Sequence, residues 1–154
     1  MMYYTHAVFG IFIALIAIDI FQIKNKALFI LIALFFSIFP DIDESRSRIG
    51  RKNKIISRIV SFIFGHRGIF HTIYIPLILF FILNIINFEI AFASVIGYFS
   101  HLILDSLTKN GIKPFYPIIS KKVNGFFKTN SIVEKLFFLA LILANIYVSV
   151  KYIQ

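Results

Sequence analysis

The chain has 154 residues, of which 59% are apolar and 15% are charged, and its mean hydropathy is +0.88. Soluble domains are about half apolar and about a quarter charged, so this composition excludes a soluble globule and indicates an integral membrane protein. The formal charge of +9 would suggest a nucleic-acid partner in a soluble protein. In a membrane protein such a charge more often reports topology, so we expect membrane lipid and no nucleic acid as partners.

The absence of cysteine limits the chemistry that the chain can carry. It excludes disulfides, thiolate metal sites and a cysteine nucleophile. Any metal must therefore be held by nitrogen and oxygen ligands.

Five apolar runs predict five membrane helices, at residues 7–23, 27–39, 69–88, 90–107 and 132–150. Most of these runs approach the twenty or so residues that cross a bilayer core. The second run would extend only about 20 Å as a helix, so we expect it to be tilted, shallow or partly interfacial. The predicted fold is all-α: a single-domain, small polytopic transmembrane helical bundle over residues 1–154.

Two shorter patterns complete the predicted elements. Residues 54–65 place four polar side chains at offsets 0, 3, 4 and 7 with apolar residues between them, which predicts an amphipathic helix lying in the membrane interface. Ser131 and Glu134 form a capping-box pattern that marks the start of the last helix.

Charge asymmetry predicts the orientation. Hairpin turns at residues 24–26 and 87–89 would return both long loops to the side of the N-terminus, and most of the lysines and arginines lie in those loops. Positive residues mark the cytoplasmic side. We therefore expect an inner (cell) membrane protein with its N-terminus in the cytoplasm and its C-terminus outside.

The histidines and several aspartates fall at one end of the predicted helices, on this cytoplasmic side. Each of them alone would be an interfacial polar residue satisfied by water or headgroups. Together they favour a shared function, because ionisable groups near a bilayer are costly and tend to be functional. The candidate metal ligands are His6, Asp41, Asp43, His66, His71, His101 and Asp105.

Local spacing supports some of these candidates. His101 and Asp105 are four residues apart on a predicted helix, so their side chains share a face. Asp41 and Asp43 follow Pro40, and in an extended chain residues two apart point to the same side. The alternative for this aspartate pair is a helix-ending turn with a solvated acidic tip.

The pair His66 and His71 has a different spacing. Five residues do not bring two side chains to one face of a regular helix. We therefore expect residues 65–68, with a glycine at each end, to form a turn leading into the helix that carries His71.

Imidazole and carboxylate ligands without sulfur favour Zn²⁺, with Mn²⁺ or Fe²⁺ as alternatives, over Ca²⁺. The candidates outnumber the ligands of one tetrahedral ion that keeps a water position, so one, two or more ions are compatible with them. Arg67 lies between two candidate ligands, where its guanidinium could clamp a phosphate. The alternative role of Arg67 is that of one more positive charge on the cytoplasmic side.

Four motifs follow one another in the chain: Thr5-His6, Pro40-Asp41-Ile42-Asp43, residues 65–72 (GHRGIFHT) and residues 97–105 (GYFSHLILD), followed by Thr108, Gly111 and Pro117. In this order they resemble the YdjM-type family of membrane-bound metal-dependent hydrolases. The resemblance covers roughly residues 5 to 117 and implies a small multi-span protein with metal-hydrolase activity. One departure is Glu44, where related sequences often carry His, so position 44 is not counted among the ligands. The ligand order is also similar to that of zinc-dependent phospholipase C and P1 nuclease, in spacing alone.

The leading hypothesis is a membrane-bound metal-dependent hydrolase that cleaves a phosphate ester of a lipid or amphiphile at the cytoplasmic interface. A metal-activated water would attack the phosphate, with Asp43 as general base and Arg67 as the phosphate clamp. Two alternatives from other classes are a metal-ion transporter and a structural membrane protein whose metal holds helix ends together.

Overall fold

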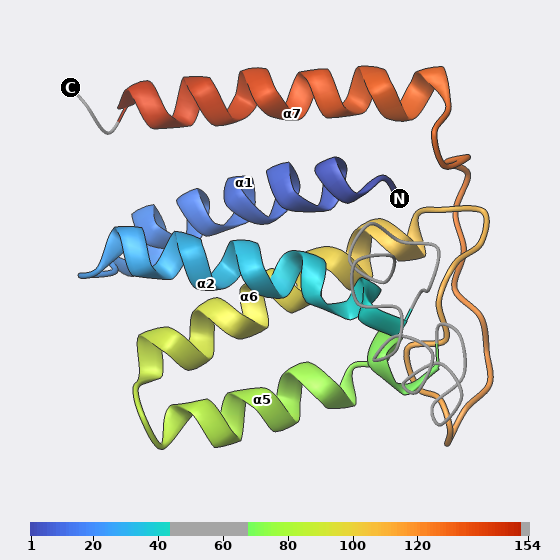
Figure 1. The fold of residues 1–154 in the computed structure, drawn as a ribbon, viewed down its shortest axis with the longest axis horizontal. Helices are drawn as coiled ribbons and strands as arrows, with labels where there is room; N and C mark the ends of the chain where they lie inside the picture. Colours follow the sequence, from blue (N-terminus) through green and yellow to red (C-terminus); the bar gives the residue numbers. More distant parts are fainter. Residues whose placement is uncertain (44–67, 152–154) are drawn as a thin grey trace.

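The structure, a computed structural model, describes residues 1–43 and 68–151, and these residues form a helical bundle (Figure 1). The α-helices in this part of the chain are α1 (Tyr3–Phe21), α2 (Lys26–Ile38), α5 (Tyr74–Asn84), α6 (Phe88–Ser106) and α7 (Ile132–Lys151). Two short 3-10 helices, η1 (Phe39–Asp43) and η2 (Ile69–His71), follow α2 and precede α5. The described residues contain isolated β-bridges but no β-strand. The predicted all-α fold is confirmed.

Three of these helices, α1, α6 and α7, are long and apolar enough to cross a membrane. Helix α2 has the 13 residues expected from the sequence. The prediction for the third run was wrong in length, because α5 has 11 residues and spans only about 17 Å. The hydroxyl of Thr72 donates to the carbonyl of Ile69 at 2.7 Å, and the Thr72 backbone is extended, so this part of the run is not α-helical. The amphipathic helix predicted at residues 54–65 lies outside the described residues.

Helices α1, α2, α6 and α5 lie side by side, and α7 lies along α1 at the edge of the bundle (Figure 1). Helix α2 packs against both α1 and α6, and α5 packs against α6. The N-terminus, the end of α2, the start of α5 and the end of α6 therefore meet at one end of the bundle (Figure 1). This is the arrangement that the predicted hairpins require.

Small residues allow the central helices to approach closely. A side chain at Gly97 of α6 would overlap the backbone carbonyl of Ala33 in α2, and one at Gly10 of α1 would overlap the side chain of Ser37. The buried alanines Ala14, Ala17, Ala33 and Ala93 belong to the same hydrophobic cluster as Phe29 of α2. Close van der Waals packing of this kind is a main source of helix association in lipid.

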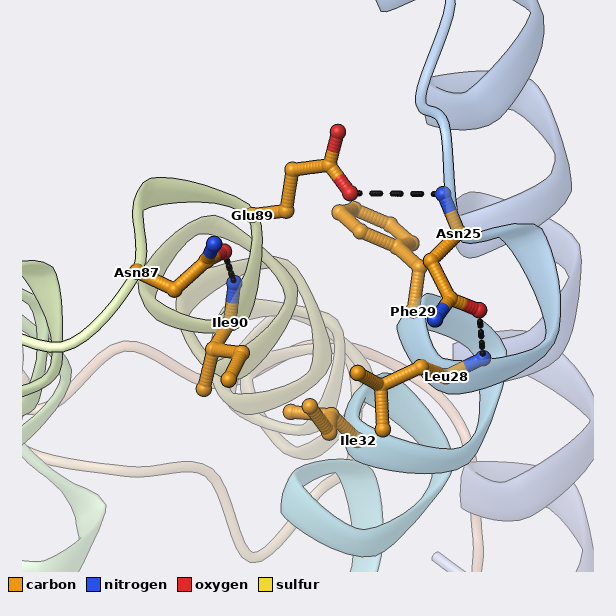
Figure 2. A pocket seen from close by; sticks show the side chains of 7 residues that line it. All are labelled: Asn25, Leu28, Phe29, Ile32, Asn87, Glu89 and Ile90. Atoms are coloured by element: carbon orange, nitrogen blue, oxygen red, sulfur yellow. Dashed lines mark hydrogen bonds between the residues drawn. The ribbon is translucent and has the colours of Figure 1, made fainter.

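At the opposite end of the bundle, hydrogen bonds cap α2 and α6 and join the connection between α1 and α2 to the first turn of α6 (Figure 2). Asn25 and Asn87 cap α2 and α6 by accepting from the amides of Leu28 and Ile90 at 3.1 and 3.2 Å. The Glu89 carboxylate accepts from the backbone nitrogens of Lys24 and Asn25 at 3.1 and 3.4 Å. A cavity of about 130 Å³ lies between these groups. It is remote from the histidines, so we assign it no part in the site below.

We predict that Gly97→Ala lowers the free energy of unfolding by about 1–3 kcal/mol, because the added methyl group must push α2 away from α6. The measurement is thermal or denaturant unfolding of the purified protein in detergent. The matched control is Ile103→Ala on the half-exposed face of the same helix, which should change stability less. Equal stability of Gly97→Ala and the wild type would contradict the close contact.

Candidate metal centre

Five of the seven predicted ligands lie together at the end of the bundle where the N-terminus is found. They come from four elements, α1, η1, η2 and the last turns of α6: His6, Asp41, His71, His101 and Asp105. Asp43 ends η1, and its side chain is not among the described parts of the structure. His66 and Arg67 fall outside the described residues, so their predicted roles stay predictions.

The carboxylate of Asp105 lies between histidines from two other segments. Its Oδ1 is 3.3 Å from Nε2 of His6, and its Oδ2 is 3.6 Å from Nε2 of His71. The amino nitrogen of Met1 lies 2.6 Å from the same Oδ1. Asp105 and the two histidines are buried. A carboxylate at this depth is costly unless compensating charge or hydrogen bonds surround it.

His101 joins the other members of the cluster. Its Nε2 lies 3.3 Å from Nε2 of His71, 3.8 Å from Oδ1 of Asp41 and 4.0 Å from Oδ2 of Asp105. Its ring is stacked on that of His6, with centroids 3.9 Å apart. The four-residue spacing of His101 and Asp105 therefore has the consequence predicted from the sequence. Two overlapping groups could each hold a cation, His6 with His101 and Asp105, and Asp41 with His71 and His101.

A backbone carbonyl orients the His101 ring. Nδ1 of His101 lies 2.9 Å from the carbonyl oxygen of Ser37, which can only accept a hydrogen bond. Nδ1 therefore carries the proton, and in the neutral ring Nε2 presents its lone pair to the cluster. Metal-binding histidines commonly donate their second nitrogen to a carbonyl or carboxylate in this way.

The cluster fits a divalent cation in chemistry and in spacing. At bond lengths of about 2.0–2.1 Å, neighbouring ligand atoms of a tetrahedral zinc ion stand about 3.3–3.4 Å apart. The nitrogen of His6 and the oxygen of Asp105 are 3.3 Å apart, and so are the nitrogens of His71 and His101. Within the described residues, Nδ1 of the buried His6 has no hydrogen-bond partner, while its Nε2 makes the 3.3 Å ion-pair contact with Asp105. A buried polar group without a partner costs free energy that a bound cation would recover.

Asp41 is the most accessible member of the cluster, with 14% of its side chain exposed. Burial raises the pKa of Asp41 above its ordinary value, and the nearby His6 opposes this effect. Of the two alternatives for residues 41–43, the structure excludes the extended chain and has a tight helical turn that ends α2. These residues belong to a 3-10 helix with three residues per turn, in which residues two apart do not share a face.

His71 also lies on a different element from the one predicted. It ends the short 3-10 helix η2, which begins after Gly68, and α5 begins only at Tyr74. The amide of Ile73 donates to the carbonyl of Pro114 at 3.0 Å and ties this junction to the loop after α6. Such a contact between distant segments could not be seen in the local sequence pattern.

The comparisons with known proteins identify the family of this chain. The model of the YdjM inner membrane protein family matches residues 1–154. This chain belongs to the YdjM family. It is 42% identical over 114 residues to the uncharacterized protein YvsG of Bacillus subtilis (strain 168), covering 72% of this chain and 71% of YvsG.

More distant YdjM relatives match a smaller region. The inner membrane proteins YdjM of Escherichia coli (strain K12) and of Shigella flexneri are each 33% identical over 92 residues, covering 55% of this chain. The match covers 47% of each relative, so the chain spans about half of their length. No solved structure matches the chain. The family assignment and the apolar helices together establish a YdjM-family inner membrane protein.

Glu134 has a larger role than its sequence pattern indicated. As predicted, the amide of Glu134 donates to the Ser131 hydroxyl at 3.3 Å at the start of α7. The Glu134 carboxylate is fully buried and accepts from the backbone nitrogens of Met2 and Asn130, each at 2.6 Å, and from the hydroxyl of Thr5 at 3.3 Å. It therefore anchors the first turn of α1 immediately before His6. Its position in the sequence, 128 residues after His6, gave no signal of this contact.

We predict that Glu134→Ala lowers the free energy of unfolding by about 3 kcal/mol, because it removes the acceptor of two part-buried backbone hydrogen bonds and of the buried Thr5 hydroxyl. The control is Glu89→Ala, which removes exposed hydrogen bonds at the opposite end and should cost less than about 1 kcal/mol. Denaturant unfolding in detergent measures both variants. Equal losses in the two would refute the anchoring role of Glu134.

Proposed function

We propose that this protein is a membrane-bound metal-dependent hydrolase that acts on a phosphate ester of a lipid or amphiphile. The observation that supports it is the convergence of three imidazoles and two carboxylates, from four separate elements, in two overlapping groups of three that could each hold a cation. Buried ionisable groups in a membrane protein most often serve a function. Their ligand types favour Zn²⁺, with Mn²⁺ or Fe²⁺ as alternatives.

The residues of the cluster would have different roles according to their burial and position. His6, His71, His101 and Asp105 are buried and would hold the cation. The Ser37 carbonyl fixes the His101 ring so that Nε2 is available as a ligand. The ionised carboxylates of Asp41 and Asp105 would together balance the charge of a divalent ion. When bound, such an ion polarises water and neutralises charge on a phosphoryl group.

The number of ions follows in part from His101. Because Nδ1 of His101 is committed to Ser37, only Nε2 is available, and it can serve one ion at a time. The two overlapping groups therefore favour a single ion on the described residues. A second ion would need further ligands, for which the sequence offers Asp43 and His66.

The substrate side of the proposal rests on Asp41 and on the location of the cluster. Asp41 is the accessible edge of the site, and the site lies at the ends of membrane helices, where amphiphiles present their headgroups. Asp43 as proton acceptor and Arg67 as phosphate clamp complete the proposed machinery. The excess of positive residues in the loops at this end supports a cytoplasmic location.

A structural metal site is the second candidate. Its specific support is the full burial of His6, His101 and Asp105, which is typical of closed coordination. Transport has less support, because transport sites usually lie near the middle of the bilayer on broken helices. The residues of the cluster belong instead to the element ends that meet at one end of the bundle (Figure 1).

We predict that the purified wild type binds at least one divalent ion per chain and that His101→Ala and Asp105→Asn lose it. Each substitution removes a donor from the cluster. Elemental analysis of detergent-purified protein measures the metal content. Asp19→Asn, an exposed aspartate of α1 outside the cluster, is the matched control and should retain the metal. A wild type without metal after reconstitution with Zn²⁺, Mn²⁺ or Fe²⁺ would refute the site.

The same samples test the reaction. We expect the wild type to hydrolyse phosphatidic acid, a monoester, or phosphatidylglycerol, a diester, in mixed micelles, and we expect His101→Ala to be slower by at least about a hundredfold. Bound metal without turnover of either lipid would favour the structural role. Metal-ion flux into protein-containing vesicles would favour transport.

A further inference from the structure

The loop between α6 and α7 carries an unbalanced positive charge. Residues 107–131 contain no aspartate or glutamate but have five lysines, all exposed: Lys109, Lys113, Lys121, Lys122 and Lys128. The carboxylates that flank the loop, Asp105 and Glu134, are buried inside the bundle. Within the described parts of the chain, no salt bridge joins these lysines to a carboxylate.

Two β-bridges bring lysines from opposite sides of the loop next to each other. The antiparallel bridge Ile112–Val123 makes Lys113 and Lys122 neighbours across the loop. Near the loop ends, the amide of Lys109 donates to the carbonyl of Phe127 at 2.9 Å, and Lys128 follows directly in the chain. Neighbouring like charges are unfavourable, and an anion between them would remove that cost.

The same loop exposes large apolar side chains. Ile118 is 77% and Phe126 is 69% exposed, and Phe115 and Ile119 are also exposed. Exposed apolar groups interleaved with lysines are typical of segments that lie in the membrane interface, where the apolar groups enter the acyl boundary and the cations meet headgroups. The loop starts and ends at the same end of two membrane helices (Figure 1), which holds it near headgroup depth.

We propose that residues 108–130 form a docking surface for the headgroups of anionic phospholipids. The phosphates lie against the lysine pairs Lys109 with Lys128 and Lys113 with Lys122. Ile118 and Phe126 enter the adjacent acyl region. This surface is separate from the histidine cluster and does not depend on the hydrolase proposal.

The chain has no tryptophan, so Phe126→Trp supplies a single fluorescent reporter in the loop. We expect its emission to be that of a residue in the membrane interface rather than in water. In phosphatidylcholine vesicles with a minor fraction of phosphatidylglycerol, energy transfer to pyrene-labelled phosphatidylglycerol should exceed transfer to pyrene-labelled phosphatidylcholine several-fold. The excess should fall as salt is added. A water-like emission or equal transfer to both lipids would overturn the proposal.

Charge variants in this background identify the groups responsible. Changing the four paired lysines to glutamine should abolish the preference for phosphatidylglycerol over phosphatidylcholine. Changing only one pair to glutamine should reduce that preference. Lys24→Gln with Lys26→Gln at the other end of the bundle is the control and should leave it intact. An unchanged preference in the fourfold variant, or its loss in the control, would overturn the proposal. A competition with inorganic phosphate gives a further test. If inorganic phosphate displaces phosphatidylglycerol more than chloride does at equal ionic strength, the surface binds free phosphate and the proposal is overturned.

Discussion

The need to compensate a carboxylate buried at the end of a membrane helix organises this end of the molecule. Asp105 sits at the last turn of α6, and its two oxygens face His6 of α1 and His71 of η2. Three chain segments must therefore converge on one residue. They can do so because glycines at positions 10 and 97 let α1, α2 and α6 approach closely beneath the cluster. The close packing at Gly10 and Gly97 is therefore what allows the histidines to surround the buried carboxylate of Asp105.

The buried carboxylates at this end have different partners. Asp105 faces the imidazoles of His6, His71 and His101. Glu134 instead accepts hydrogen bonds from two backbone amides and a hydroxyl. The first arrangement leaves nitrogen lone pairs available for a cation, and the second uses its oxygens to hold α1 and α7 together. The loop after α6 adds a further support, because its Pro114 carbonyl accepts from Ile73, two residues after His71.

The sequence predicted the parts of the site that depend on short-range geometry. The helical pair His101 and Asp105, the short second helix and the Ser131 cap follow from spacing and composition, and the structure confirms them. The 3-10 conformation around Asp41 and His71 was not predicted, because local propensity does not distinguish it from a turn or an extended chain. The contacts of Glu134 and of the Ser37 carbonyl arise only when distant segments pack, so no local pattern could indicate them.

Helix α2 has 13 residues, fewer than a straight crossing of the hydrocarbon core requires. A membrane responds to such a mismatch by thinning locally, or the helix changes its tilt. The Ser37 carbonyl near the end of α2 is the acceptor that orients His101. A change in the tilt of α2 relative to α6 would therefore move the Ser37 carbonyl relative to His101, which would link the thickness of the surrounding bilayer to the orientation of one imidazole in the histidine cluster.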